Sequence, residues 1–181
     1  MVPNTINADG DAGTACVDAL TFRAAMKKVA TPVTIIATGT GDLRHGITAS
    51  AVCSLSDQPP MVLVCVNLNS TILPHIRANR SFSANFLDEE QSALAQHFAG
   101  MTKVYGPERF QLGNWRNLAT GAPVLEDALT VFDCSLECEY ESPTHAVLVG
   151  RVEAIMQDRT SRALVYAGGQ FSFPAPILPM G

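Results

Sequence analysis

The sequence has few charged side chains for a chain of its length. Only 16% of its 181 residues are Asp, Glu, Lys or Arg, whereas 47% are hydrophobic. A chain this long suits one domain with its own core, and a small monomer must expose most of its surface. So few charges therefore indicate that part of the surface is buried against another molecule, and a homodimer interface is the simplest interpretation.

Basic clusters are also absent. The formal net charge is -5, and no run of Lys and Arg occurs anywhere along the chain. This pattern argues against a nucleic-acid groove, which needs a concentrated positive field. It leaves room for a local phosphate site, because backbone N–H groups and hydroxyls can form one without net charge.

Paired cysteines and long apolar segments are missing too. The five cysteines (Cys16, Cys53, Cys65, Cys134 and Cys138) include no C-x-x-C pair, so we expect neither a disulfide framework nor a metal site. Cys53 and Cys65 lie in apolar runs, where cysteine behaves as a small hydrophobe. Residues 1–15 lack the apolar core of a signal peptide, and no apolar run reaches transmembrane length. We therefore expect a cytoplasmic protein with no membrane partner.

The short motifs of several enzyme classes do not occur. The chain contains no G-x-G-x-x-G, no GxxxxGK[ST], no G-x-S-x-G and no H-E-x-x-H. The four histidines, His45, His75, His97 and His145, are widely spaced. Dinucleotide binding of the Rossmann type, P-loop chemistry, serine hydrolysis and zinc proteolysis therefore have no positive support.

Short strands dominate the predicted secondary structure. We expect helices at residues 19–29, 72–78 and 89–98, the first capped by Asp18 and the second by Ser70 or Thr71. Strands are predicted at 33–38, 47–55, 61–67, 81–87, 131–140 and 146–156, with a glycine break at 168–169 in the segment 164–173. No βαβ period appears, so the pattern favours a mainly β barrel with short peripheral helices over a Rossmann sheet.

Three segments flank or interrupt this pattern. Residues 1–15 read as a disordered N-terminal tail, residues 16–173 as the domain, and residues 174–181 as an extended, proline-rich C-terminal tail. The connection at 100–121 is long for a compact domain. Connections of that length are usually functional or covered by a partner.

Small and hydroxyl side chains gather in the strand predicted at 47–55. Thr48, Ala49, Ser50 and Ala51 follow a glycine-rich turn, and small side chains let a planar ligand approach the backbone. The alternative is a strand that packs against a bulky neighbour, which is the commoner case for the composition alone.

Two further polar stretches lie beside predicted elements. Asn67 to Thr71 (NLNST) precedes a helix and is either a phosphate cradle or an ordinary N-terminal cap. Ser142 to His145 (SPTH) joins two strands. A histidine there is a general acid, a ring-stacking group or a solvated turn residue, and the last is the most common.

The order of these segments is more specific than any one of them. The chain reads FRAAMKKVATPVTIIAT, then HGITASAVCSLSDQPPMVLVCVNLNSTILPHI, then FSANFLDEEQSALAQHFAG, and continues through RFQLGNW, GAPVLEDAL, FDCSLECEYESPTHAVLVGRV and LVYAGGQF. Over roughly residues 20–173 it resembles the flavin reductase-like family, the short flavin reductases that partner two-component monooxygenases. The small-residue strand, the L-x-D-x-P-P break and the N-x-x-S/T turn carry this resemblance.

The resemblance implies a split β-barrel of Greek-key type that binds FMN or FAD at a homodimer interface. The implied activity is hydride transfer from NAD(P)H to the flavin, with reduced flavin passed to a partner monooxygenase. It places Asn85 near the flavin ring and His145 at the nicotinamide side as the catalytic residue. By position, it assigns flavin or dinucleotide contacts to Thr48, Ala49, Ser50, Cys53, Ser54, Asn67, Ser70, Thr71, Asn85, Tyr166, Gly168, Gly169 and Phe171.

The chain departs from the family pattern at two places. The family usually has Gly-Asp-His before the long strand, where this chain has Pro143-Thr144-His145. The family's C-terminal motif usually carries Arg-Gly or Gly-x-Tyr, where this chain has residues 167–171, AGGQF. Both departures fall at the implied nicotinamide pocket, so the resemblance supports flavin binding more directly than the identity of the reductant.

Other functions fit the same pattern. One alternative is a reductase with tightly held flavin that acts on a bulkier acceptor, such as a cobalt corrinoid. Another is a flavin-binding module with no enzymatic activity. An oxidase of the pyridoxamine phosphate type is disfavoured, because no cluster of phosphate-binding Arg or Lys occurs.

Overall fold

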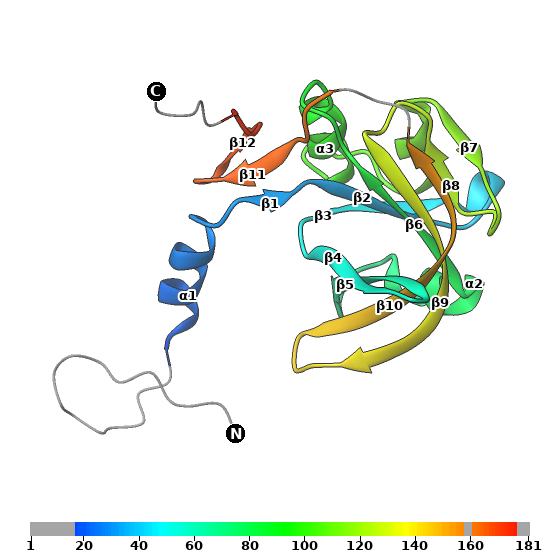
Figure 1. Ribbon diagram of the computed structural model, residues 1–181, viewed down its shortest axis with the longest axis horizontal. Helices are drawn as coiled ribbons and strands as arrows, with labels where there is room; N and C mark the ends of the chain where they lie inside the picture. Colours follow the sequence, from blue (N-terminus) through cyan, green and yellow to red (C-terminus); the bar gives the residue numbers. More distant parts are fainter. Residues whose placement is uncertain (1–16, 158–160, 177–181) are drawn as a thin grey trace, which may run out of the picture.

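The centre of the fold is one strongly curled antiparallel sheet (Figure 1). The computed structural model describes residues 17–157 and 161–176, so the predicted tail 1–15 and residues 177–181 lie outside the described part. The sheet has seven strands, in the order β3 (His45–Ala49), β2 (Thr34–Thr38), β6 (Ser81–Phe86), β9 (Thr130–Glu141), β10 (His145–Gln157), β5 (Pro60–Asn67) and β4 (Val52–Asp57). The prediction of a mainly β fold is confirmed.

The two edge strands of this sheet, β3 and β4, are consecutive in the chain. Only Ser50 and Ala51 separate them, so the sheet must curl until its two edges come close. No ladder pairs β3 with β4 among the described residues, and the curl therefore stays open along this seam. The strand expected over 47–55 is thus broken, because the chain leaves the ladder with β2 after Ala49 and joins the ladder with β5 at Val52.

Apolar side chains fill both faces of the curled sheet. Inside the curl, Ile36, Val64, Phe82 and Leu148 belong to one buried cluster. Alternate residues of β2 point the other way, so that Ile35 and Ala37 join a second cluster on the outer face. Burial on both faces explains why β2 reads as a continuous apolar run rather than an alternating one.

Short helices cover the outside and one end of the sheet. The 7-residue helix α2 (Leu73–Asn79) packs against β6 and β2, and α3 (Ser92–Phe98) packs against β3. The predicted cap of α2 is wrong: Ile72 occupies that position and no side chain caps the helix. The long connection after α3 holds the 3₁₀ segment η2 (Gly106–Gln111) and the short strand β7 (Trp115–Asn117), followed by β8 (Pro123–Leu125). A further 3₁₀ turn, η1 (Gly41–Leu43), precedes β3.

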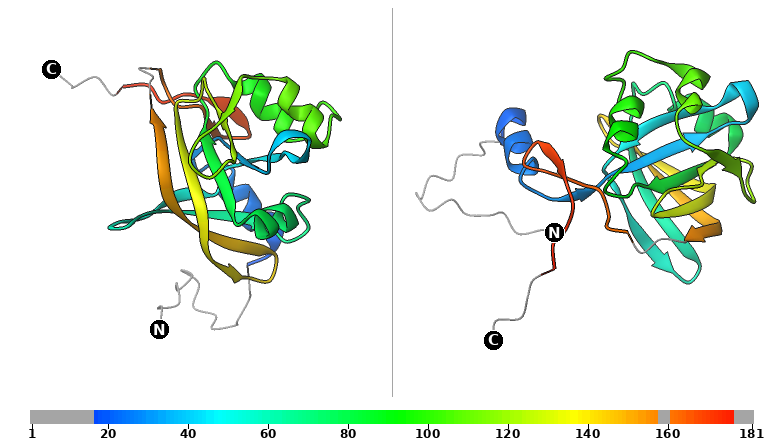
Figure 2. Two further views of the ribbon diagram at one scale, coloured as in Figure 1. Left: turned by 90° about the vertical axis from the view of Figure 1, so that its right-hand side faces the viewer. Right: turned by 90° about the horizontal axis from the view of Figure 1, so that it is seen from above.

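An arm projects from the curled sheet and is built from two segments far apart in the sequence. It consists of helix α1 (Ala19–Met26) and a three-stranded sheet of β1 (Thr31–Pro32), β11 (Val165–Ala167) and β12 (Gln170–Ser172). The right-hand view of Figure 2 shows that the arm stands to one side of the curled sheet. As predicted, Asp18 caps α1, accepting hydrogen bonds from the N–H groups of Leu20 and Thr21.

Helix α1 exposes its apolar side chains. The apolar residues Leu20, Phe22 and Met26 are 73%, 58% and 45% exposed, and no residue of α1 is buried. Exposed apolar groups in such a cluster are usually found where another molecule binds. Among the described residues, no helix is both long and apolar enough to cross a bilayer.

Candidate functional site

A pocket of about 520 Å³ lies between the curled sheet and the arm. Pockets of this size accommodate small organic ligands. Its wall joins the end of β3 to the hairpin β11–β12, two segments more than a hundred residues apart in the sequence. The lining residues are Val33, Thr48, Ala49, Ser50, Gln96, Ala99, Met101, Tyr166, Gly169, Gln170 and Phe171.

Close packing of β3 against α3 shapes the side of this pocket that the curled sheet forms. Gly46 has no room for a side chain, because an added Cβ would lie 2.6 Å from Cε1 of Phe98. The Thr48 hydroxyl donates a hydrogen bond to the carbonyl of Ala95, at 2.6 Å. The small residues therefore do two things: they bring α3 onto β3, as the packing interpretation expected, and they leave Ala49 and Ser50 lining an open pocket.

The arm side of the pocket is a tight hairpin with an aromatic pair. Gly168 and Gly169 have φ values of +64° and +86°, a left-handed conformation that favours glycine, so the predicted glycine break is a turn. The rings of Tyr166 and Phe171 meet edge to face with 5.6 Å between their centroids. Gly168 itself lies outside the pocket lining, and its N–H donates to the carbonyl of Lys27.

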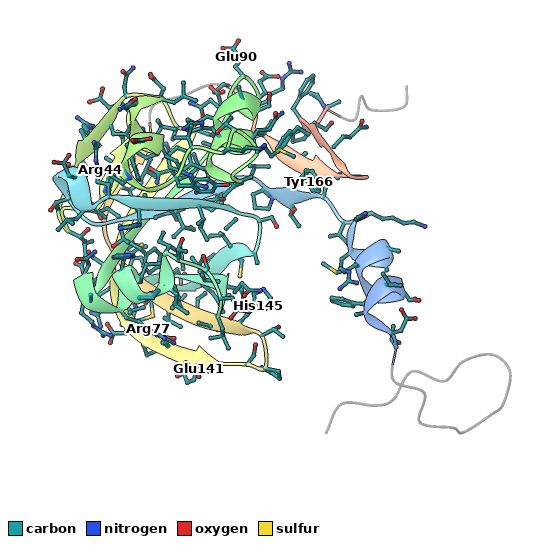
Figure 3. The ribbon with its side chains drawn as sticks, turned by 180° about the vertical axis from the view of Figure 1, so that it is seen from behind. Arg44, Arg77, Glu90, Glu141, His145 and Tyr166 are labelled. Carbon is teal, nitrogen blue, oxygen red and sulfur yellow. The ribbon has the colours of Figure 1, made fainter. Side chains whose placement is uncertain are left out.

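His145 and Asn67 face one another at the end of the sheet nearest the arm. They are register partners across β10 and β5. The same strand β5 also contacts the seam, because the N–H of Cys65 donates to the carbonyl of Ala51. Figure 3 shows His145 at the side of the curled sheet that faces the arm, and Tyr166 on the arm itself. Thr144 Oγ1 lies 2.8 Å from Nδ1 of the His145 ring, whereas Nε2 has no hydrogen bond to a described residue.

The remaining sequence-predicted residues are distributed over other parts of the molecule. Thr71 lines a second pocket near His45, and the Ser70 and Thr71 hydroxyls have no hydrogen bond to a described residue. Cys53 and Ser54 are exposed on β4 and line a third hollow of about 280 Å³, so the expectation that Cys53 is a buried hydrophobe is wrong. Cys65 is half-buried, and its burial, followed by the neighbouring Cys53, raises the pKa of its thiol.

Asn85 lies in the core and not at the pocket. Its side chain is 0% exposed, and its amide donates to the carbonyl of Ile35 and the hydroxyl of Ser83. Its Oδ1 accepts the N–H of Leu125 at 2.8 Å. All of these partners belong to the protein, so the side chain fixes β8 against β6 and has no access to a flavin ring.

The sequence interpretation missed several lining residues. Gln96, Ala99 and Met101 lie where α3 ends and the long connection begins, and Gln170 lies beside the hairpin turn. The unusual length of the 100–121 connection was the signal that could have placed this segment at the site. Among residues 17–157 and 161–176, no group of three or more His, Cys, Asp or Glu is arranged to hold a metal ion.

Comparison with known proteins gives one consistent result. The family model described as "Flavin reductase like domain" matches residues 26–174. An FMN reductase (NADH) RutF 1 of Methylorubrum extorquens is 42% identical over 151 residues, which is 83% of this chain and 74% of the relative.

Two solved structures share the fold. BorF, the flavin reductase component of a bacterial two-component tryptophan halogenase, is 32% identical with a TM-score of 0.79, covering 86% of this chain and 98% of that one. The Streptomyces globisporus NADH:FAD oxidoreductase SgcE6, in complex with NAD and FAD fragments, is 26% identical with a TM-score of 0.79, covering 88% and 94%. This chain therefore belongs to the flavin reductase-like family.

Proposed function

We propose that this protein is an NADH-dependent flavin reductase that acts on FMN. The observation that carries the proposal is the pocket of about 520 Å³ between the small residues of β3 and the hairpin of the arm. It is supported by the name FMN reductase (NADH) carried by a relative that is 42% identical, and by the NAD and FAD fragments bound in SgcE6. In this family setting, the curled sheet with its open seam corresponds to a split barrel.

The pocket suits a flat ring system for two reasons. Ala49 and Ser50 carry small side chains, so a planar ligand can lie against the backbone at the seam. Phe171 and Tyr166 provide an apolar wall on the opposite side, where a second ring can stack. A bound flavin supplies the redox chemistry, accepting a hydride from reduced nicotinamide, while the protein positions the two rings.

His145 is our candidate for positioning the reductant. Thr144 lies within hydrogen-bond distance of Nδ1 and Ser142 anchors the adjoining backbone, so the ring is held at the end of β10. The other ring nitrogen has no hydrogen bond to a described residue and is free to bond to a ligand. Hydride transfer needs no acid or base, so His145 would contribute by holding the nicotinamide in place.

We also propose that the protein works as a homodimer. The exposed apolar side chains of α1, which touch no buried core in the protomer, are the observation that favours it. A second protomer packed against the arm would cover them and would close the open side of the pocket. The resemblance placed the flavin at such an interface.

A separate enzyme is the proposed consumer of the reduced flavin. BorF is the reductase component of a two-component halogenase, and this chain shares its fold at 32% identity. The open pocket on the side of the barrel is consistent with a flavin that enters and leaves as a substrate. A flavin-dependent monooxygenase or halogenase would then receive it.

Anaerobic mixing with NADH or NADPH, with flavin absorbance followed over time, tests the proposal. We expect NADH to bleach added FMN at a rate that depends on the protein. Ser50→Arg should fill the pocket and weaken FMN binding without unfolding the chain, whereas Ala119→Arg adds the same charge at an exposed residue outside the pocket and should have no effect.

Two results would contradict the proposal. A protein that binds FMN but leaves it oxidised with either reductant would be a binding module. A folded Ser50→Arg variant with unchanged FMN affinity would mean that FMN does not bind at the seam between β3 and β4.

A further inference from the structure

The pocket between the curled sheet and the arm is polar without being charged. No charged side chain lines its described wall. Its polar side chains belong to Thr48, Ser50, Gln96, Tyr166 and Gln170. A wall of this kind suits a neutral hydrogen-bonding edge of a ligand better than a carboxylate or a phosphate, whose charge would lose its water without gaining a partner.

The place of Gln96 in helix α3 brings it to this pocket. Ala95 and Phe98 are buried on the core side of the helix, whereas Gln96 and Ala99, three residues apart, line the pocket. The Thr48 hydroxyl donates to the carbonyl of Ala95 at 2.6 Å, and this bond holds α3 against β3. The backbone beside Gln96 is therefore fixed next to the small residues of β3.

The side-chain amide of Gln96 is available to a ligand. It is exposed and has no hydrogen bond to a described residue, while the main-chain carbonyl of Gln96 accepts the N–H of Met101 at 3.1 Å and holds the end of the helix. A primary amide presents an N–H donor and a carbonyl acceptor side by side. Gln96 can therefore form two parallel hydrogen bonds with a planar group that presents the complementary pair.

An isoalloxazine ring carries such a group at one edge. Its pyrimidine part is an imide, in which N3–H lies between the carbonyls at C2 and C4. The proposed flavin lies against Ala49 and Ser50, and Gln96 belongs to the same wall because α3 packs on β3. Gln170 carries the same amide, but it lies on β12 in the arm, on the opposite wall.

We propose that Gln96 is a specificity-determining residue that pairs with the imide edge of the flavin. Its amide N–H donates to a ring carbonyl, and its carbonyl accepts N3–H. The inference rests on the proposed function and deepens it, because it names the part of the flavin that this side chain reads. Such a pair favours a ring with a free N3–H over a ring in which that position is blocked, because the blocked ring leaves a polar group in the pocket without a partner.

Two other roles for Gln96 lead to different expectations. A glutamine that only faces solvent would have no influence on which flavin binds. A glutamine that reads the carboxamide of the nicotinamide would change the affinity for NADH and leave the choice of flavin unchanged. Binding measurements separate all three roles.

FMN and 3-methyl-FMN are the two probes, because they share the phosphate and differ only at N3. Quenching of flavin fluorescence measures the binding of each to the full chain, with no reductant present. We expect the wild type to bind FMN about tenfold more tightly than 3-methyl-FMN. Gln96→Met keeps the length of the side chain and removes its donor and acceptor.

In Gln96→Met, the FMN affinity should fall about three- to tenfold, whereas the 3-methyl-FMN affinity should change little. The change in the ratio of the two affinities isolates the bond between the side chain and the imide, because any effect of the bulk of the methyl group is present in both proteins.

Gln111→Met is the matched control. Gln111 is also exposed, and it does not line this pocket. Its substitution should leave both affinities unchanged. Both variants change exposed side chains, so their melting temperatures should equal that of the wild type, and a loss of FMN binding then reports recognition and not folding.

An unchanged ratio of affinities in Gln96→Met would overturn the inference. A weaker apparent NADH affinity with an unchanged flavin ratio would overturn it in favour of the nicotinamide carboxamide. Because the titration needs no turnover, a protein that binds FMN but does not reduce it would refute the proposed function and leave this test intact. A wild type that binds neither flavin would refute both.

Discussion

Replacing Asn85 by leucine separates a structural role from a role beside the flavin. The amide of Asn85 accepts the N–H of Leu125 and donates to the carbonyl of Ile35, and all of these groups are buried. Leucine has a similar size but cannot form either bond. One orphaned donor and one weakened acceptor cost about 2–4 kcal/mol together. For a domain of this size, that corresponds to a fall in melting temperature of about 4–16 °C.

Thermal unfolding followed by circular dichroism measures the loss, and flavin titration is run on the same samples below the transition. Asn114→Ala is the control, because its amide bonds to the Asp127 carboxylate at the exposed surface and should change stability little. An Asn85→Leu variant that melts at the wild-type temperature would refute the structural role of Asn85. A loss of FMN affinity with unchanged stability would refute it too, because that result would mean that Asn85 contacts the flavin ring.

Three further predictions follow from other parts of the structure. His145→Ala should slow flavin reduction and weaken the apparent NADH affinity by about ten- to a hundredfold, on the order of 1–3 kcal/mol, while the flavin affinity stays nearly unchanged. Anaerobic stopped-flow reduction at saturating FMN measures both effects. A variant with the wild-type rate and NADH affinity would mean that His145 is a solvated turn residue. Cys53 is exposed, whereas burial raises the pKa of Cys134 to about 12, so a thiol reagent should label Cys53 and not Cys134 in the folded protein. The Cys53→Ser variant should keep the wild-type turnover with NADH. Mass spectrometry of the labelled peptides checks this, and a Cys53 that stays unlabelled in the folded protein would contradict its exposure on β4. Phe22→Glu on α1 should convert a dimer to a monomer of about 19 kDa in sedimentation velocity; a wild-type chain that is already monomeric at micromolar concentration would contradict the dimer.

The strands were predictable because their side chains follow simple physical rules. β-branched and apolar runs at 33–38 and 61–67 are found in β2 and β5, and the two long strands β9 and β10 lie over the ranges predicted at 131–140 and 146–156. Asp18 was predictable as a cap because its carboxylate serves two free N–H groups of the helix immediately next to it. These features depend on neighbours close in sequence.

Features set by distant contacts were not predictable in the same way. The strand expected over 47–55 breaks because Ala49 and Val52 pair with different strands, and nothing local to those residues indicates the change. From the sequence, Asn85 is an ordinary polar residue near the end of a strand. Its role depends on the N–H of Leu125 in β8, which lies 40 residues later and donates to its side chain. Arg109 is buried where its guanidinium donates to the carbonyl of Gly46, which belongs to a segment far upstream.

The two-residue joint between the edge strands also has a consequence for how the protein folds. β3 and β4 are immediate neighbours in the chain, yet they reach their native separation only when β2, β6, β9, β10 and β5 have all assembled between them. Three of the inner pairings, β2–β6, β6–β9 and β10–β5, join segments far apart in sequence, and such pairings form slowly because long loops must close first. Ser50 and Ala51 therefore reach their native arrangement among the last parts of the sheet, and flavin binding should recover late in refolding, after the far-ultraviolet strand signal has returned.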